Sequence, residues 1–198
     1  MNEDIAFDLE KFKAVVHYII SKCGLKDNVG RTVLYELLYF SDFNFYEIYE
    51  KAITGESYVK KPRGPVPMHF IDATLELESE GKISICKEKS NHGFKFKYSS
   101  ISPPEIGFLA QNELELIDGV VDKLSDMYSN EISEYSHGDL PWRLAKDDGE
   151  LNYEAVFYRE PEYSVRSYGE YEGCSFDYRP KFKKLTVKNE LYEGNRIF

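Results

Sequence analysis

The chain of 198 residues contains little cysteine. Cys23, Cys86 and Cys174 are widely spaced, odd in number and form no Cys-x-x-Cys pair. Neither a disulfide framework nor a cysteine-based metal site fits this pattern, which is typical of proteins from a reducing compartment. No apolar run approaches the ~20 residues that a membrane-spanning helix needs. The acidic start of the chain also lacks the basic and then apolar layout of a signal peptide. We therefore expect a cytoplasmic protein with no membrane contact.

Positive charge is also scarce, because 25 Lys and Arg face 35 Asp and Glu and leave a formal net charge of −10. Sequence-independent nucleic-acid binding needs a positive surface, so nucleic acid is an unfavourable partner. The same acidity suits solubility or a basic protein partner. The densest basic spot is Lys60, Lys61 and Arg63, beside Tyr58. It has the chemistry to hold a phosphate or an acidic partner, but a solvated loop is the simpler interpretation.

Established catalytic signatures are missing too: the sequence has no Walker loop, GxGxxG, GxSxG or HExxH. Ser136, His137 and Asp139 are triad-type residues, but catalytic triads are assembled across a fold and not by adjacency. The simpler interpretation is that His137 and Asp139 bond to the backbone around a turn. Asp139 would also cap the next helix, and Trp142 would anchor the turn in the core. We expect no enzyme, no metal and no cofactor.

Aromatic residues are abundant, with 16 Tyr and 13 Phe against one Trp. Tyrosine buries its ring while its hydroxyl stays in water, and tyrosine-rich surfaces are common at protein–protein contacts. From residue 152 onward the tyrosines lie among charges without a sustained period. We therefore divide the chain into a domain at 8–160 and a Tyr-rich C-terminal extension at 161–198. Three alternatives are open for the extension: it lies along the domain, it adds an edge strand with 184–188 as the candidate, or it becomes ordered only on a partner.

Hydrophobic periodicity predicts an α+β fold, a mainly helical single globular domain with a small β-hairpin. The first helix begins after the N-cap Asp8 and stops at Gly24. Ser41-Asp42 is a candidate break in the second helix, and Asn112 with Glu115 resembles a capping box. The expected helices are 8–23, 31–49, one from Pro67 to Gly81, 112–128, 131–136 and one from Pro141 to about 149, and the expected hairpin is 82–98.

The segment Ile53–Pro67 has three prolines and two glycines in fifteen residues. Each proline fixes its own φ and pushes the preceding residue toward extended geometry. The segment is too irregular for a helix and too rich in breakers for a central strand. We expect one non-repetitive path, which serves either as a structural corner or as a presented surface.

Three segments together resemble a known family: Leu37–Phe43, Ile53–Pro67 and Ser136–Trp142. In this order and spacing they are similar to the Panacea domain, the SocA-like or phage-associated GepA-type antitoxin domain, over about residues 10–160. Carried onto this chain, the family motif lies at Tyr39, Phe40, Asp42, Gly55, Tyr58, Lys60, Gly64, Pro65, Val66, His137, Pro141 and Trp142. We expect most of these residues to hold the fold.

The resemblance implies a non-enzymatic antitoxin that neutralises a cognate protein toxin, encoded by the adjacent gene, through direct binding. One relative acts instead as an adaptor that delivers its toxin to a cytoplasmic AAA+ protease, which is the alternative here. Tyr58, Lys60, Arg63 and Pro65 are the candidate residues of the partner surface. Tyr58, Lys60 and Arg63 are the best candidates on the condition that their side chains point outward. A hydrolase using His137 and Asp139 is less favoured, and a winged-helix DNA binder is the weakest option.

Overall fold

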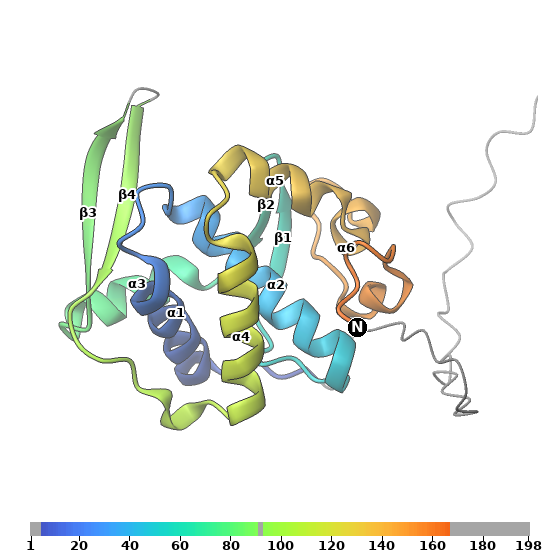
Figure 1. The fold of residues 1–198 in the computed structure, drawn as a ribbon, viewed down its shortest axis with the longest axis horizontal. Helices are drawn as coiled ribbons and strands as arrows, with labels where there is room; N and C mark the ends of the chain where they lie inside the picture. Colours follow the sequence, from blue (N-terminus) through green and yellow to red (C-terminus); the bar gives the residue numbers. More distant parts are fainter. Residues whose placement is uncertain (1–4, 91–92, 167–198) are drawn as a thin grey trace, which may run out of the picture. The chain divides into compact units, whose positions relative to one another are not determined.

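The computed structural model describes residues 5–90 and 93–166 of the chain (Figure 1). The predicted α+β class is confirmed: the unit is mainly helical, with two small antiparallel sheets of two strands each. The elements are α1 Leu9–Cys23, α2 Arg31–Tyr49, β1 Tyr58–Lys61, β2 Gly64–Pro67, α3 Phe70–Ser79, β3 Ile83–Ser90, β4 Gly93–Ser100, η1 Ile106–Phe108, α4 Gln111–Leu124, α5 Ser129–Gly138, α6 Leu140–Leu144 and η2 Tyr153–Tyr158. No helix in this described part is long and apolar enough to cross a membrane. The candidate strand at 184–188 lies outside the described residues.

Helix α2 is the centre of the unit and contacts α1, α4, α5, β2 and η2 (Figure 1). It is apolar nearly all round, as expected of a helix covered on most faces. The expected break at Ser41-Asp42 is wrong. The Ser41 hydroxyl donates to the Leu37 carbonyl one turn back (2.7 Å), and the Asp42 carboxylate accepts bonds from a different segment. Neither side chain disturbs the helix backbone, so α2 runs unbroken over 19 residues.

The boundaries of the other helices follow the sequence in part. Asp8 caps α1 as predicted, because its carboxylate accepts from Lys11 N at 3.0 Å. The capping box at Asn112 and Glu115 is wrong: α4 begins one residue before Asn112, and Glu113 accepts from Ala110 N. Glu113 also accepts from the Lys11 ammonium on α1, so a tertiary contact favours the start of α4 at Gln111.

The segment after Ile53 differs from the expected non-repetitive path, because residues 58–67 form a β-hairpin with Tyr58 opposite Pro67 and Lys61 opposite Gly64. Proline cannot donate to a ladder and is confined to edge strands. Here β2 carries Pro65 and Pro67 at the free edge, while β1 also bonds on its other side to the chain at 149–151. Pro67 therefore ends a strand, and the next helix, α3, starts at Phe70.

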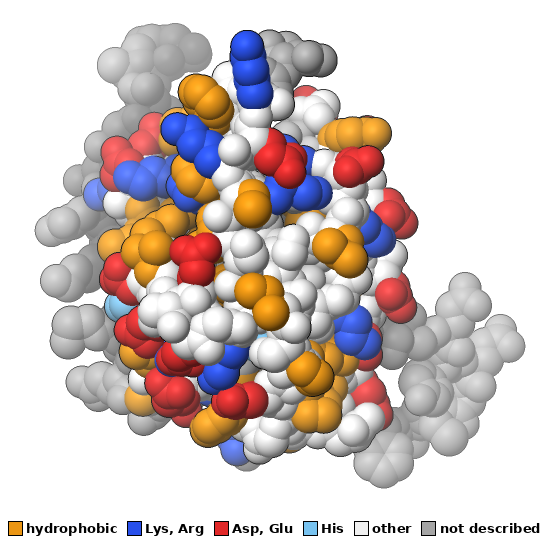
Figure 2. All heavy atoms as spheres, turned by 90° about the vertical axis from the view of Figure 1, so that its left-hand side faces the viewer, with side chains coloured by type: hydrophobic (Ala, Val, Ile, Leu, Met, Phe, Trp, Pro, Cys, Tyr) orange, Lys and Arg blue, Asp and Glu red, His pale blue; other side chains and the backbone are white. Residues whose placement is uncertain are grey.

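The second hairpin, β3–β4, confirms the period-two pattern of the sequence, with Ile83 paired to Ser100 and Ser90 to Gly93. Its strands carry four lysines and one acidic residue, Glu88. Figure 2 shows this face of the molecule, with lysine and arginine side chains gathered toward the top of the view, where the hairpin lies in Figure 1. Two of the lysines, Lys95 and Lys97, donate to carbonyls of the α1–α2 loop, so they hold the hairpin against that loop.

Gly64 provides the first test of this fold. Its φ of +106° is rarely adopted by other residues, and an added Cβ would lie 2.0 Å from Glu36 Oε1 on α2. Gly81 has a φ of +71° but open space around its missing Cβ, so Gly81→Ala is the matched control. We expect Gly81→Ala to cost about 1 kcal/mol of unfolding free energy and Gly64→Ala at least about twice that, measured by urea denaturation. Equal losses in both variants would show that the approach of Gly64 to Glu36 is unimportant.

Candidate functional site

The three segments that carry the family resemblance meet around α2 through buried hydrogen bonds. The Tyr39 hydroxyl donates to Asp139 Oδ2 at 2.8 Å, which joins α2 to the turn after α5. Asp42 accepts from the Thr54 amide (2.9 Å), the Thr54 hydroxyl (2.7 Å) and the Tyr58 hydroxyl (2.8 Å). These bonds join α2 to the start of the first hairpin.

Asp42 is a buried carboxyl group that depends on these three bonds. Burial raises its pKa, and the hydrogen bonds from Thr54 and Tyr58 partly offset that rise. Burial likewise raises the pKa of Tyr58 well above its ordinary value, so the phenol stays protonated and remains a donor to Asp42. Removing either donor would leave a buried acceptor without its partner, which costs more than the net value of the bond.

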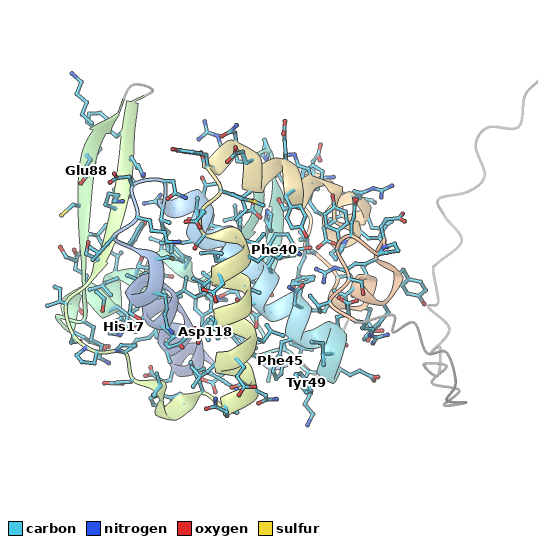
Figure 3. All side chains as sticks on the ribbon, in the orientation of Figure 1. His17, Phe40, Phe45, Tyr49, Glu88 and Asp118 are labelled. Atoms are coloured by element: carbon cyan, nitrogen blue, oxygen red, sulfur yellow. The ribbon has the colours of Figure 1, made fainter. Side chains whose placement is uncertain are left out.

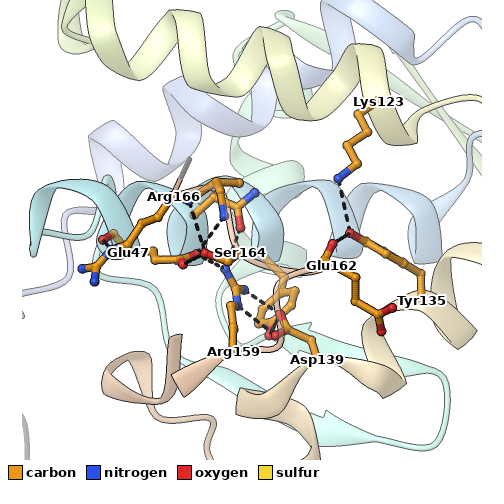
Figure 4. Close-up of polar contacts among 11 residues, drawn as sticks. Glu47, Lys123, Tyr135, Asp139, Arg159, Glu162, Ser164 and Arg166 are labelled. Carbon is orange, nitrogen blue, oxygen red and sulfur yellow. Dashed lines mark hydrogen bonds and ion pairs between the residues drawn. The ribbon is translucent and has the colours of Figure 1, made fainter. Parts of the chain in front are cut away.

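A second buried network joins α2 to the chain after η2 (Figure 4). The guanidinium of Arg159 is fully buried and donates to both carboxylate oxygens of Asp139, at 2.8 and 2.5 Å. Its third nitrogen donates to Asn44 Oδ1 (2.8 Å) and Glu47 Oε2 (3.0 Å). Burial lowers the pKa of Arg159, but the adjacent Asp139 carboxylate outweighs it and the pKa is raised. One arginine therefore balances two buried carboxylates.

Sequence reasoning missed Arg159, which lies at the end of the predicted domain among surface-like charges. The expected role of Asp139 as a helix cap is also wrong in part. Asp139 stands at the N-cap position of α6, but its side chain makes no capping bond. Its carboxylate binds Arg159 and Tyr39 instead, because a buried carboxylate needs a cation and donors that a helix end alone does not supply.

His137 and Trp142 stack on each other beside the same turn. Their rings lie 4.0 Å apart at an interplanar angle of 19°, and the Lys60 ammonium lies 4.1 Å from the centre of the Trp142 ring. Trp142 is half-buried and packs against the hydrophobic core, so it anchors the turn there in part, as predicted. Burial and the nearby Lys60 lower the pKa of His137. His137 Nε2 has no hydrogen-bond partner among the described residues.

This arrangement bears on the hydrolase alternative. A triad needs a carboxylate bonded to the histidine and a nucleophile on the other ring nitrogen. Here the Asp139 carboxylate is bonded to Arg159 and Tyr39, and the His137 ring lies against Trp142. Ser136 donates to Glu36 and to the Ser133 carbonyl. The three neighbours in sequence thus have separate partners. Among the described residues no group of three or more His, Cys, Asp or Glu has the geometry to hold a metal.

The residues named for the partner surface differ widely in exposure. Tyr58 does not meet the condition of pointing outward, because it is fully buried: its ring packs against Tyr39 and Phe43 while its hydroxyl reaches Asp42. Pro65 is buried as well. Lys60 is half-buried and donates to the Ala145 carbonyl at 3.0 Å. Only Arg63 of the four is exposed, at the β1–β2 turn.

The other motif residues also contact the interior of the unit. Phe40, which is labelled in Figure 3, packs against Tyr39 and Tyr135. Gly55 has a φ of +69° and lies against the Ala6 carbonyl, Val66 is half-buried in β2, and Pro141 is buried at the start of α6.

A groove of about 210 Å³ lies between α2, α4, α5 and the segment 163–165. Its walls are mainly apolar: Phe40, Leu116, Val120, Leu124, Tyr135 and Val165. Polar groups enter at two places, where Asn44 lies on α2 and Lys123 on α4. The Lys123 ammonium lies 3.4 Å from the Tyr135 hydroxyl (Figure 4). Because three helices and a distant segment form this groove, sequence reasoning did not find it.

The described part of the C-terminal extension, residues 161–166, packs against the unit and forms one wall of the groove. Glu47 on α2 anchors it: its carboxylate accepts from the Ser164 hydroxyl and the Val165 amide, and its carbonyl accepts from Arg166 Nε. Tyr163 also lies against Tyr135, with ring centres 5.0 Å apart. Glu47 thus binds both Arg159 and this wall.

Arg159 tests the second network. Arg159→Met leaves Asp139 and Glu47 buried without their cation, and removing one partner of a buried ion pair typically costs about 3–5 kcal/mol. We expect a loss of that size in urea denaturation. Arg143→Met, at an exposed arginine, should stay within about 0.5 kcal/mol. A loss below about 1 kcal/mol for Arg159→Met would contradict the role of this network.

Glu36 predicts a pH dependence. It is fully buried, accepts one bond from the Ser136 hydroxyl (3.0 Å), and burial raises its pKa well above the ordinary value. The folded state therefore keeps a proton that the unfolded chain releases, and this group lowers stability as pH rises from its unfolded pKa toward its folded pKa. We expect Glu36→Gln to gain stability relative to the parent protein as the pH rises above the ordinary pKa of glutamate. A stability difference that stays constant as the pH rises would contradict the raised pKa of Glu36.

Comparison with known proteins identifies the family. The model of the family described as "Antitoxin SocA-like, Panacea domain" matches residues 34–143, more than half of the chain. No curated protein and no solved structure matches the chain. The matched range includes all twelve motif positions that meet around α2 but ends before Arg159. The chain therefore belongs to the SocA-like antitoxin family with a Panacea domain.

Proposed function

We propose that this chain neutralises a protein toxin by binding it directly. The observation that carries the proposal is the family match over residues 34–143, because membership of an antitoxin family supports a role in toxin–antitoxin systems in general. The step from that general role to direct binding is our own. We further propose that the toxin is encoded by the adjacent gene, that both proteins meet in the cytoplasm, and that the antitoxin acts without catalysis.

The internal contacts of the motif support binding by a rigid, folded surface. Asp42, Tyr58 and Asp139 have hydrogen-bond partners inside the unit, which favours a structural role for them. The first hairpin presents an exposed turn, Lys61–Arg63, on top of this framework. The Ser133 hydroxyl donates to the Arg63 carbonyl at 2.7 Å, and Lys61 pairs with Asp148 at 2.6 Å. A turn held in place before binding loses little conformational entropy on association.

Charge supports a basic toxin. With a net charge of −10, the chain would attract a basic protein over long range, which raises the association rate and makes it sensitive to salt. Arg63 and Lys61 are exposed cations on a chain whose net charge is negative. We infer that they contact acidic groups on the toxin and so fix its orientation. This retains the β1–β2 segment as the presented surface but moves its contact residues from Tyr58 and Pro65 to the turn.

The adaptor alternative differs in its outcome. Occlusion by a bound antitoxin predicts a stable complex with the toxin, whereas an adaptor predicts that the toxin disappears faster when the chain is present and that this loss needs a AAA+ protease. The half-life of the toxin, measured in cells with and without that protease, distinguishes the occlusion mechanism from the adaptor mechanism. We favour occlusion, because the described unit is a closed, well-packed domain whose motif segments are joined to each other.

Arg63→Glu tests the proposed surface. We expect it to weaken binding of the adjacent gene product about tenfold or more, because it replaces an exposed guanidinium in the contact with a carboxylate. Lys51→Glu is the control: it changes the net charge by the same amount at an exposed position at the end of α2. Titration calorimetry of the full chain with the purified product measures both.

Equal affinities for the two variants would remove the β1–β2 turn from the interface. Growth in co-expression tests the wider proposal. The adjacent gene should stop growth when expressed alone, and the intact chain should restore it. A gene that is harmless alone, or that stays toxic beside this chain, would contradict the antitoxin role.

A further inference from the structure

We propose that the groove between α2, α4 and α5 receives one aromatic side chain of the toxin, next to a toxin carboxylate that pairs with Lys123. This inference rests on the proposed antitoxin function and adds to it the second contact and the chemistry of the partner segment. Helix α5 links the two contacts, because Ser133 holds the β1–β2 turn and Tyr135, two residues later, lines the groove.

The size of the groove suits a single side chain. Its volume is about 210 Å³, below the ~300–1,000 Å³ of typical small-molecule pockets. An apolar cavity of about 150 Å³ is large enough to bind benzene. The groove therefore has room for one phenyl, phenol or indole ring but not for a larger cofactor. Large aromatic side chains in well-packed pockets are the anchors that dominate many protein interfaces.

Gly119 lines the groove, and the packing of the described residues does not require a glycine there. Glycine within a helix costs about 1 kcal/mol relative to alanine, and Gly119 lies well inside α4. An added Cβ at this position would meet no heavy atom within 4 Å, and its φ is not in the left-handed region. Packing within the described residues thus gives no reason for the glycine. Gly119 lines the groove, so a larger side chain at this position would reduce the space that an occupant needs.

The walls of the groove favour an aromatic occupant. Phe40 and Tyr135 pack with ring centres 5.2 Å apart, and Tyr135 and Tyr163 with centres 5.0 Å apart. A further ring can join this row in edge-to-face or offset geometry, which contributes beyond simple apolar burial. The wall that carries Tyr163 is held by Glu47, so the groove is formed before the toxin arrives.

Lys123 supplies the charge at the rim. Its side chain is exposed, and in the described part of the chain its contacts are the Tyr135 hydroxyl at 3.4 Å and the face of the Tyr135 ring. It forms no ion pair with the carboxylates described there. A cation beside an apolar groove is complementary to a segment in which a carboxylate lies next to an aromatic residue. Such a contact fixes the position of the toxin segment, because a toxin carboxylate paired with Lys123 aligns the neighbouring aromatic ring with the groove.

A small probe tests the groove directly. The full chain is titrated with 3-phenylpropionate, which joins a phenyl ring to a carboxylate, and amide shifts are followed by NMR. We expect saturable shifts centred on Gly119 and its neighbours on α4. Gly119→Leu should abolish them by filling the groove, and Lys123→Gln should weaken binding several-fold. Gly107→Leu, at another glycine with open space around it, should leave the titration unchanged. Absence of saturable binding, or binding that survives Gly119→Leu, would overturn the proposal.

Toxin binding is then measured with the same variants. Gly119→Leu should lower affinity for the adjacent gene product at least tenfold without lowering the melting temperature, and Gly107→Leu should not. If the parent protein neutralises the toxin and Gly119→Leu does so equally well, the groove proposal fails and the antitoxin role stands. If the parent protein neither binds nor neutralises the product, both fail. A dimer of the chain alone that Gly119→Leu dissociates in light scattering would overturn the toxin as occupant in favour of a second copy.

Discussion

Burial of α2 on nearly all sides is the constraint on which the rest of the structure depends. The helix carries five buried polar side chains, Glu36, Ser41, Asp42, Asn44 and Glu47, and a buried polar group without a partner is costly. Apart from Ser41, which bonds within the helix, each finds its partner in another segment: α5, the chain before β1, or the chain after η2. The polar face of one helix therefore organises segments that are distant in sequence.

This constraint explains how the sequence motif of an antitoxin family can be mainly architectural. Tyr39 and Asp42 join the helix to Asp139 and to Thr54 and Tyr58, and Gly64 makes room for Glu36. Contacts of this kind fix where the β1–β2 turn and α5 lie, but they leave the exposed side chains free to vary. In our account the motif residues stabilise the fold, and the β1–β2 turn and the groove beside α5 determine which toxin is bound.

Sequence reasoning recovered what local periodicity determines. The bounds of α2 and the β3–β4 hairpin follow from apolar spacing, and Asp8 is a cap because its side chain bonds within its own turn. It failed where a distant partner decides the outcome. Tyr58 was a candidate surface residue, but its hydroxyl donates to the buried Asp42 carboxylate. Asp139 was predicted to cap a helix, but its carboxylate binds Arg159, which lies twenty residues later in the sequence. The groove has no sequence signature, since its walls come from four separate segments.

Direct binding of the toxin is the central claim, and calorimetric titration of the full chain with the purified product of the adjacent gene tests it most directly. The account predicts a saturable complex with Kd of about 10⁻⁷ M or tighter, the range of stable specific interfaces, and loss of toxin activity at the same stoichiometry. A toxin that remains fully active at saturating concentrations of this chain, with no heat of binding, would contradict it.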